Sequence, residues 1–176
     1  EAVAVADIRQ AADLLAAVYR RTHTQDGYVS LEVSPELAHD APGTLAEARR
    51  LWQEVDRPNL MIKVPGTRTC LPVIRTLLAE GINVNITLLF AREAYSLVAE
   101  AYLADLEERL GKGMPVDRVA SVASFFISRI DTLVDKRIDA RASAAAPTDR
   151  ARLEALKGKI AVANAKQAYS LFTGLF

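Results

Sequence analysis

The sequence has few of the residues and patterns that define several classes of protein. Its 176 residues include one cysteine, Cys70, which excludes a disulfide within the chain and favours a reducing compartment such as the cytoplasm. The 22 lysines and arginines are balanced by 22 aspartates and glutamates, so overall charge favours neither nucleic acid nor an acidic membrane as a partner. It contains no apolar run long enough to span a bilayer and no secretory signal at its start. The two histidines, His23 and His39, lack the spacing of metal ligands, so we expect no metal.

The rest of the composition is typical of a globular domain. Hydrophobic residues make up 51% of the chain and charged residues 25%, which is an ordinary balance for a soluble protein. A chain of this length can form one sizeable core and is short for two. We therefore expect a single domain over residues 1–176. The eight glycines form no phosphate-cradling motif, so no nucleotide cofactor is indicated.

Helical and strand-like patterns alternate along the chain. Apolar residues at helical spacing predict a helix that begins after Asp7, and Thr44 with Glu47 has the pattern of a capping box that starts a second helix. Strands are predicted at residues 28–33, 59–65, 82–88 and 119–127, with further helices at 72–80, at 91–110, and from 129 onward with a break at 142–147. Such alternation predicts βαβ units and a parallel sheet. The loop lengths fit either an open doubly wound sheet or part of a (β/α)8 barrel.

Lys63 interrupts the apolar strand predicted at residues 59–65. Lysine is rarely buried without a partner or a function. Burial favours the neutral amine, which is the form that attacks a carbonyl to make a Schiff base. The structural alternative is a lysine that reaches solvent at the strand end or pairs with one carboxylate.

Polar side chains also occur near the C-terminal ends of the other predicted strands. Because side chains alternate between the two faces of a strand, one face of each strand carries these polar residues. The residues expected to converge are Glu32, Lys63, Asn85, Thr87 and Ser124. Catalytic residues of (β/α)8 enzymes come from the C-terminal ends of several strands, so the set indicates one pocket.

The chemistry of each side chain indicates a role in that pocket. Lys63 is the candidate nucleophile, and Glu32 is suited to hold a water molecule or relay a proton. Asn85 and Ser124 are neutral hydrogen-bonding groups suited to the hydroxyls of a polyol, and Thr87 is suited to fixing the water. For Glu32 the alternative is a buried ion pair with Lys63 that serves stability only.

Arg129 lies directly after the fourth predicted strand. A guanidinium at a junction between a strand and a helix can bind a phosphate through two hydrogen bonds. The alternative is an ion pair with Asp131 or with a neighbouring helix. The residues alone leave both interpretations open.

Four segments of the sequence, taken in order, resemble transaldolase. They are YVSLEV at residues 28–33, LMIKVPGT at 60–67, INVNITLLF at 82–90 and VASFFISR at 122–129. The segment KGKIAVANAK at 157–166 resembles the bacterial branch of the same family. The resemblance extends over essentially the whole chain, and four motifs in the right order are far more specific than any one of them.

The resemblance implies both a fold and a reaction. The family has a parallel (β/α)8 TIM barrel, and the four segments correspond to its third to sixth strands, so the chain resembles a central part of the barrel. The implied enzyme is a transferase of the pentose phosphate pathway that works without metal or cofactor. It passes a dihydroxyacetone unit between ketose and aldose phosphates through a Schiff base. The implied substrates are fructose 6-phosphate, sedoheptulose 7-phosphate, erythrose 4-phosphate and glyceraldehyde 3-phosphate.

The resemblance also implies a role for each matching residue. The catalytic positions are matched by Lys63 as the Schiff-base lysine, Glu32 as the water-holding glutamate and Thr87 as the water-positioning threonine. The substrate-binding positions are matched by Asn85 and Ser124 for hydroxyls, Arg129 for phosphate, and Phe126.

Two alternatives to a transaldolase stay open. Fructose 6-phosphate aldolase is a related barrel with the same lysine chemistry, but that group tends to carry Gln in place of Glu32 and Tyr in place of Phe126. The second alternative is a catalytically silent fragment or scaffold. The family uses an aspartate of its first barrel strand as acid/base, and this chain has no counterpart of it.

Half a barrel would leave an unpaired strand edge on each side, which proteins normally cover. We therefore expect the isolated chain to be unstable or to form a homo-oligomer that covers those edges. Analytical ultracentrifugation and a thermal melt test this expectation. Oligomers or a poorly cooperative melt are expected, and a monodisperse monomer with a cooperative melt contradicts it.

Overall fold

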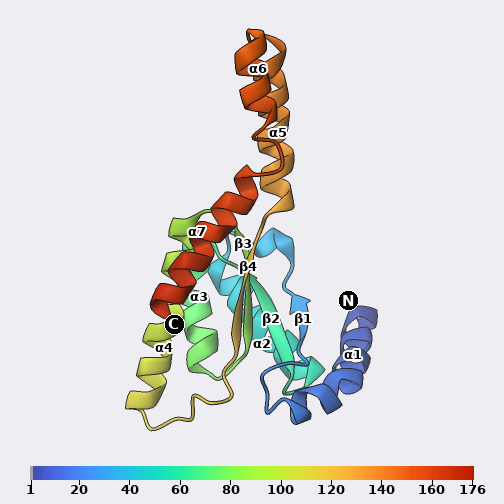
Figure 1. Cartoon of the computed structure of the whole chain (residues 1–176). Helices are drawn as coiled ribbons and strands as arrows, with labels where there is room; N and C mark the ends of the chain where they lie inside the picture. The colour runs from blue at the N-terminus through green and yellow to red at the C-terminus, as the bar shows by residue number, and fades with distance from the viewer. Residues whose placement is uncertain (1) are drawn as a thin grey trace. The chain divides into compact units, whose positions relative to one another are not determined.

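The computed structural model describes residues 2–176, which form a parallel sheet with flanking helices (Figure 1). The strands are β1 (Val29–Glu32), β2 (Leu60–Pro65), β3 (Val84–Leu89) and β4 (Ser121–Phe125). The α-helices are α1 (Ala2–Arg21), α2 (Ala41–Val55), α3 (Leu71–Ala79), α4 (Arg92–Gly111), α5 (Ser128–Ser143), α6 (Pro147–Glu154) and α7 (Ile160–Leu175). Short 3-10 helices, η1 (Pro35–Leu37) and η2 (Arg68–Cys70), follow β1 and β2.

The chain divides into two compact units. The first comprises the residues up to Leu88 together with Leu97–Ser124, and the second comprises Leu89–Ser96 together with Phe125–Phe176. Among residues 2–176, none of the helices is long and apolar enough to cross a membrane.

The strands lie in the order β1-β2-β3-β4, and their pairing is parallel. An open doubly wound sheet reverses its strand order at a switch point, whereas successive strands of a TIM barrel are neighbours all the way round. The strand order is therefore that of a segment of a barrel, and it confirms the predicted α/β class. The predicted strands are present with ends shifted by one or two residues, but the break in the helices at residues 155–159 was not predicted.

The core of the first unit lies between the sheet and helices α2 and α3. On β2, Leu60, Ile62 and Val64 have no exposed surface. The buried apolar residues of the two helices are Ala48, Leu51, Val55, Val73, Ile74, Leu77 and Leu78. Because side chains alternate along a strand, Lys63 lies on the opposite face of β2 from these three strand residues.

Two buried asparagines fix the N-terminal ends of the strands. Asn59, just before β2, donates through Nδ2 to the carbonyl oxygens of Ala12 (2.9 Å) and Gly27 (2.8 Å). Asn83, just before β3, donates through Nδ2 to the carbonyl of Leu60 (2.9 Å), and its Oδ1 accepts from the backbone N–H of Ala120 (2.9 Å). Buried backbone groups need such partners, so these amides hold the strand starts at one level.

Two predicted helix starts are wrong. The first helix begins at Ala2, which places Asp7 inside it rather than at its N-cap. The second begins at Ala41, because Asp40 caps it by accepting the backbone N–H of Gly43 (3.0 Å). Thr44 is therefore a buried residue of the first turn, where its hydroxyl donates to the carbonyl of Leu37 (2.8 Å). An aspartate followed by Pro at the second helical position is as strong a start signal as the capping box.

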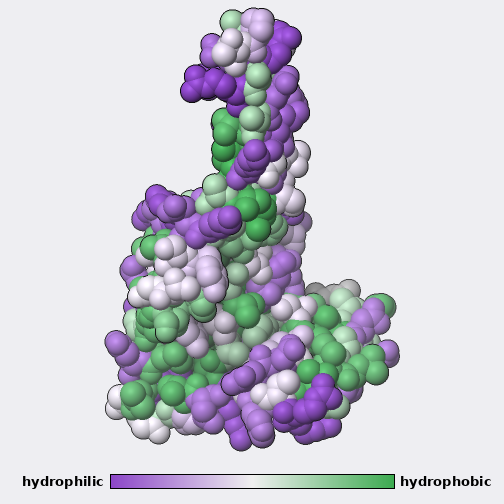
Figure 2. All heavy atoms as spheres, in the orientation of Figure 1, coloured by the Kyte–Doolittle hydropathy of each residue, from purple (hydrophilic) through white to green (hydrophobic). Residues whose placement is uncertain are grey.

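In the second unit, a row of aspartates on α5 holds the junction between α6 and α7. Asp131 Oδ1 accepts the backbone N–H of Ala161 (3.1 Å), and Asp135 Oδ1 accepts that of Gly158 (3.1 Å). Asp139 accepts a hydrogen bond from Lys157 Nζ at 2.7 Å. Aspartates spaced four residues apart share one helix face, so one stripe binds the whole junction. Figure 2 shows mostly polar surface over the α5–α6 hairpin.

Helix α4 contains a buried carboxylate, Asp105, with a hydrogen-bond partner for only one of its two oxygens. Asp105 has no exposed surface, and its Oδ1 accepts a hydrogen bond from Arg75 Nε at 3.2 Å. Within the described residues, Asp105 Oδ2 is buried without a hydrogen-bond partner. Burial raises the pKa of the Asp105 carboxyl, and the Arg75 guanidinium offsets only part of that effect.

We predict that Asp105 makes the protein less stable as the pH rises. Its folded-state pKa lies above the unfolded value, so folding favours the protonated acid, and this contribution is lost as pH rises through the folded pKa. Asp105→Asn removes the charge and should raise the free energy of unfolding relative to the parent at pH 7, with a smaller gain at acid pH. Urea denaturation at several pH values measures the difference. Glu107→Gln, at an exposed position of the same helix, is the control, and equal effects of Asp105→Asn at pH 4 and pH 7 contradict the prediction.

Candidate functional site

The register of the sheet places three predicted site residues in one row. Glu32 pairs with Lys63 across β1 and β2, and Lys63 pairs with Asn85 across β2 and β3. Residues in register on parallel strands point to the same face of the sheet. All three positions lie toward the C-terminal ends of their strands, where a barrel carries its active site.

Lys63 and Glu32 form an ion pair at the end of β2. The distance from Lys63 Nζ to Glu32 Oε2 is 3.1 Å, and the side chains are 27% and 47% exposed. Lys63 is therefore less buried than the apolar strand around it predicted, because its long side chain reaches past the strand to a carboxylate in solvent. The structure thus shows the structural alternative for Lys63, a lysine that reaches solvent at the strand end and pairs with one carboxylate. The pair is not the buried one considered as the alternative for Glu32.

Asn85 connects three strands through its amide. Its Nδ2 donates to Ser30 Oγ on β1 (3.1 Å), and its Oδ1 accepts from the hydroxyl of Ser124 on β4 (2.7 Å). The amide is thereby fixed in one orientation, with an N–H and a lone pair left for another molecule. Sequence reasoning did not include Ser30 among the site residues, although it shares a face of β1 with Glu32 and that parity was the available signal.

Thr87 occupies a different environment from the other site residues. Its side chain is 1% exposed, and its backbone carbonyl accepts the N–H of Gly66 (2.7 Å). Among residues 2–176, its hydroxyl makes no hydrogen bond to Glu32 or Lys63. The next residue, Leu88, has a φ of 61°, a left-handed conformation that is unusual for leucine. The regular alternation of β3 therefore ends at Thr87.

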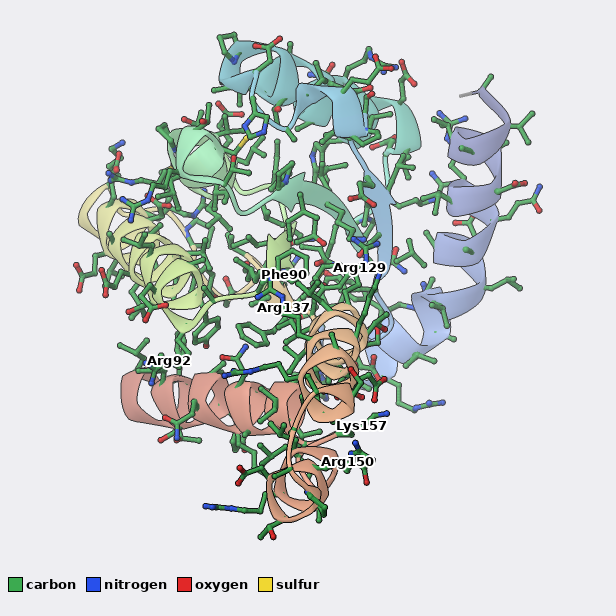
Figure 3. The ribbon with its side chains drawn as sticks, turned by 90° about the horizontal axis from the view of Figure 1, so that it is seen from above. Phe90, Arg92, Arg129, Arg137, Arg150 and Lys157 are labelled. Carbon is green, nitrogen blue, oxygen red and sulfur yellow. The ribbon has the colours of Figure 1, made fainter. Side chains whose placement is uncertain are left out.

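Phe126 and Arg129 belong to the second unit and contact each other there. The Arg129 guanidinium carbon lies 4.7 Å from the centre of the Phe126 ring, and this ring stacks on Phe90 with centres 4.9 Å apart. Arg129 and Phe90 are labelled in Figure 3. In the part of the chain that the structure describes, Arg129 forms no ion pair with Asp131, whose Oδ1 instead accepts the N–H of Ala161. Among residues 2–176, Arg129 has no ion pair with Asp131 or with a neighbouring helix, so the structure does not support that alternative.

The described residues offer a lysine and hydrogen-bonding groups rather than metal ligands. Across residues 2–176, histidine, cysteine and carboxylate side chains form no group of three that could hold a metal ion. Cys70 is buried at the start of α3, within 4.0 Å of the Thr44 hydroxyl. An amine beside a carboxylate, with a fixed amide in the same row, can add to a carbonyl group and bind the neighbouring hydroxyls.

Comparison with known proteins shows one family. Residues 1–174 match the family described as Transaldolase/Fructose-6-phosphate aldolase. Transaldolase 2 of Nostoc punctiforme is 52% identical over 177 residues, which cover 96% of this chain and 45% of that protein. The transaldolases of Thermobifida fusca (52% over 170 residues) and Parafrankia sp. (49% over 175 residues) match 97% and 99% of this chain, and 44% and 46% of their own lengths. The chain spans a little under half the length of the curated relatives it matches.

Exposure of the Lys63–Glu32 pair predicts that it contributes little to stability. Exposed ion pairs are worth about 0–1 kcal/mol, so Glu32→Gln should change the free energy of unfolding by less than about 1 kcal/mol. Chemical denaturation measures the change. Glu54→Gln is a matched control, because Glu54 is 43% exposed and pairs with Arg50 at 2.8 Å. A much larger loss for Glu32→Gln than for the control would mean that the pair serves the fold.

Proposed function

The chain belongs to the transaldolase/fructose-6-phosphate aldolase family, and we propose that it is the part of a transaldolase that carries the Schiff-base lysine. The proposed enzyme is a transferase that moves a dihydroxyacetone unit from a ketose phosphate to an aldose phosphate. The matching relatives are about twice as long as this chain, and the proposal concerns the activity of an enzyme of that length. It further includes one domain over residues 1–176, a cytoplasmic location and a place in the pentose phosphate pathway.

The observation that carries the proposal is the row formed by Glu32, Lys63 and Asn85. In the first step, the neutral amine of Lys63 attacks the carbonyl carbon of the ketose, a C–N bond forms, and a proton moves from nitrogen to the former carbonyl oxygen. Loss of this oxygen as water requires one more proton. Glu32, 3.1 Å from Lys63 Nζ, is placed to take the ammonium proton before attack and to return it to the leaving oxygen.

Bond cleavage then uses the iminium as an electron sink. The electrons of the C3–C4 bond move toward the iminium, and a base takes the proton of the C4 hydroxyl, which releases an aldose phosphate. We assign the role of this base, which removes the proton of the C4 hydroxyl, to none of the proposed site residues Glu32, Lys63, Asn85, Thr87 and Ser124. The three-carbon unit stays on Lys63 until a second aldose accepts it.

The other site residues are proposed to bind the substrate. Asn85 and Ser124 offer an N–H, a lone pair and a hydroxyl to the sugar hydroxyls, and their mutual hydrogen bond sets their orientation. Arg129 is proposed for the phosphate, Phe126 for the substrate-binding wall, and Thr87 for positioning the water. The proposed substrates are sugar phosphates such as fructose 6-phosphate and sedoheptulose 7-phosphate.

Fructose 6-phosphate aldolase is the second candidate, because the family description covers both activities. The relatives from Nostoc punctiforme, Thermobifida fusca and Parafrankia sp. are all named transaldolase, and Glu32 and Phe126 follow the transaldolase pattern. A phenylalanine has no hydroxyl to act as acid or base, which is a further reason to prefer transfer over simple aldol cleavage. Release of free dihydroxyacetone as the main product would favour the aldolase.

Borohydride trapping tests the Schiff base. Incubation with fructose 6-phosphate followed by reduction should add a sugar-derived mass to the peptide that contains Lys63, and peptide mass spectrometry locates the adduct. Lys63→Ala should abolish the labelling, while the peptides that contain the exposed Lys112 and Lys157 serve as internal controls.

The mass of the adduct separates the proposed enzyme from a silent fragment. A three-carbon adduct on Lys63 shows binding and cleavage, and a six-carbon adduct shows an active lysine whose cleavage step needs residues outside this chain. No adduct on Lys63, in this chain or in a full-length relative's equivalent preparation, contradicts the Schiff-base assignment.

A further inference from the structure

We propose that helix α7 positions the guanidinium of Arg129, through a hydrogen bond from Asn164 to the backbone of Phe90 and the aromatic stack that Phe90 begins. The inference rests on the proposed function only in naming a phosphate as the group that Arg129 binds. All the residues involved belong to the second unit.

The aromatic stack is the surface on which Arg129 lies. Phe90 and Phe126 follow β3 and β4, and the backbone N–H of Phe126 donates to the carbonyl of Leu89 (2.8 Å), which brings the two rings together. The rings are 4.9 Å apart and inclined by 19°, so no planar group fits between them. The Arg129 guanidinium, 4.7 Å from the Phe126 ring centre, therefore takes the face of Phe126 that Phe90 leaves open.

Helix α7 contacts the backbone of Phe90, the first residue of this stack. Asn164 Nδ2 donates to the backbone carbonyl of Phe90 at 2.9 Å, in a partly buried position. Phe90 lies in the short connection between β3 and α4. The amide of Asn164 therefore fixes the backbone that sets the position of the Phe90 ring.

A second contact joins α7 to the helix that carries Arg129. Asp131, two residues after Arg129 on α5, accepts the backbone N–H of Ala161 in the first turn of α7 (3.1 Å). A carboxylate at a helix N-terminus is a charge-assisted and stabilising contact. The first turns of α5 and α7 are thus fixed to each other, and Asn164 lies one turn further along α7. Arg129 is held from its own helix and from the ring beneath it.

This arrangement leaves the hydrogen-bonding edge of Arg129 free. Two other arginines of the unit donate within the protein: Arg92 to Gln167 (3.3 Å) and Arg150 to the carbonyl of Ala142 (3.0 Å). Within the described residues, Arg129 is held by a ring face and makes no hydrogen bond or ion pair. A guanidinium oriented in this way can offer two parallel N–H groups to a phosphate without first losing another partner.

Arginine modification with phenylglyoxal, read residue by residue by mass spectrometry, tests the proposal with inorganic phosphate as the probe. Phosphate should protect Arg129 in the parent chain. Asn164→Ala should raise the phosphate concentration needed for half-protection by roughly three- to tenfold, the range expected for loss of one hydrogen bond that orients a binding group. Gln167→Ala is the matched control, because it removes a side-chain hydrogen bond from the same helix without touching Phe90, and it should leave protection unchanged.

A second variant keeps the test decisive if Asn164→Ala does not fold. Phe90→Leu retains the backbone carbonyl that Asn164 binds but removes the ring, so it should also weaken protection of Arg129. Trapping of dihydroxyacetone on Lys63, which involves no phosphate, should have the same half-saturation in both variants as in the parent.

Three outcomes would overturn the positioning role of α7. They are no protection of Arg129 by phosphate in the parent, unchanged protection in both Asn164→Ala and Phe90→Leu, or equal effects of Asn164→Ala and Gln167→Ala. Failure of the proposed function is a separate result, because it would appear as absence of dihydroxyacetone trapping on Lys63 whatever happens at Arg129.

Discussion

The parallel register of β1, β2 and β3 is the constraint on which the proposed site depends. It places Glu32, Lys63 and Asn85 side by side although they are far apart in sequence. A shift of one residue between β1 and β2 would separate the amine from its carboxylate, and the same shift between β2 and β3 would remove Asn85 from the row. The chemistry proposed for Lys63 is therefore a property of the sheet as much as of the residue.

The register is fixed by groups that take no part in the proposed reaction. Asn59 and Asn83 bind backbone groups at the N-terminal ends of β2 and β3, and the fully buried faces of these strands pack in the core. In a barrel, residues at the N-terminal ends of the strands contribute to stability, and residues at the C-terminal ends form the active site. Two asparagines of β3 and its start follow this division. Asn83 connects strands at the stable end, whereas Asn85, two residues later, presents a fixed amide in the candidate site.

Much of this arrangement could be predicted from the sequence, for identifiable reasons. Period-two alternation located the strands and put Glu32, Lys63 and Asn85 on one face, because parity depends only on position along a strand. The start of α2 was mispredicted because Thr44 has the local signature of a cap while the Asp40 cap precedes it. Asp7 has the same local signature but lies inside α1. The same parity was available for Ser30, which shares a face of β1 with Glu32, and it was not used. Asn164 could not be found, since its contact to Phe90 joins residues 74 positions apart.

A crystal structure of the borohydride-reduced three-carbon adduct tests the central claim most directly. The register predicts that the adduct extends from Lys63 Nζ along the row, with its hydroxyls within hydrogen-bond distance of Asn85 and Ser124 and with Glu32 beside the new C–N bond. An adduct on another lysine, or one on Lys63 whose hydroxyls contact neither Asn85 nor Ser124, would contradict the claim that this row of the sheet is the active site.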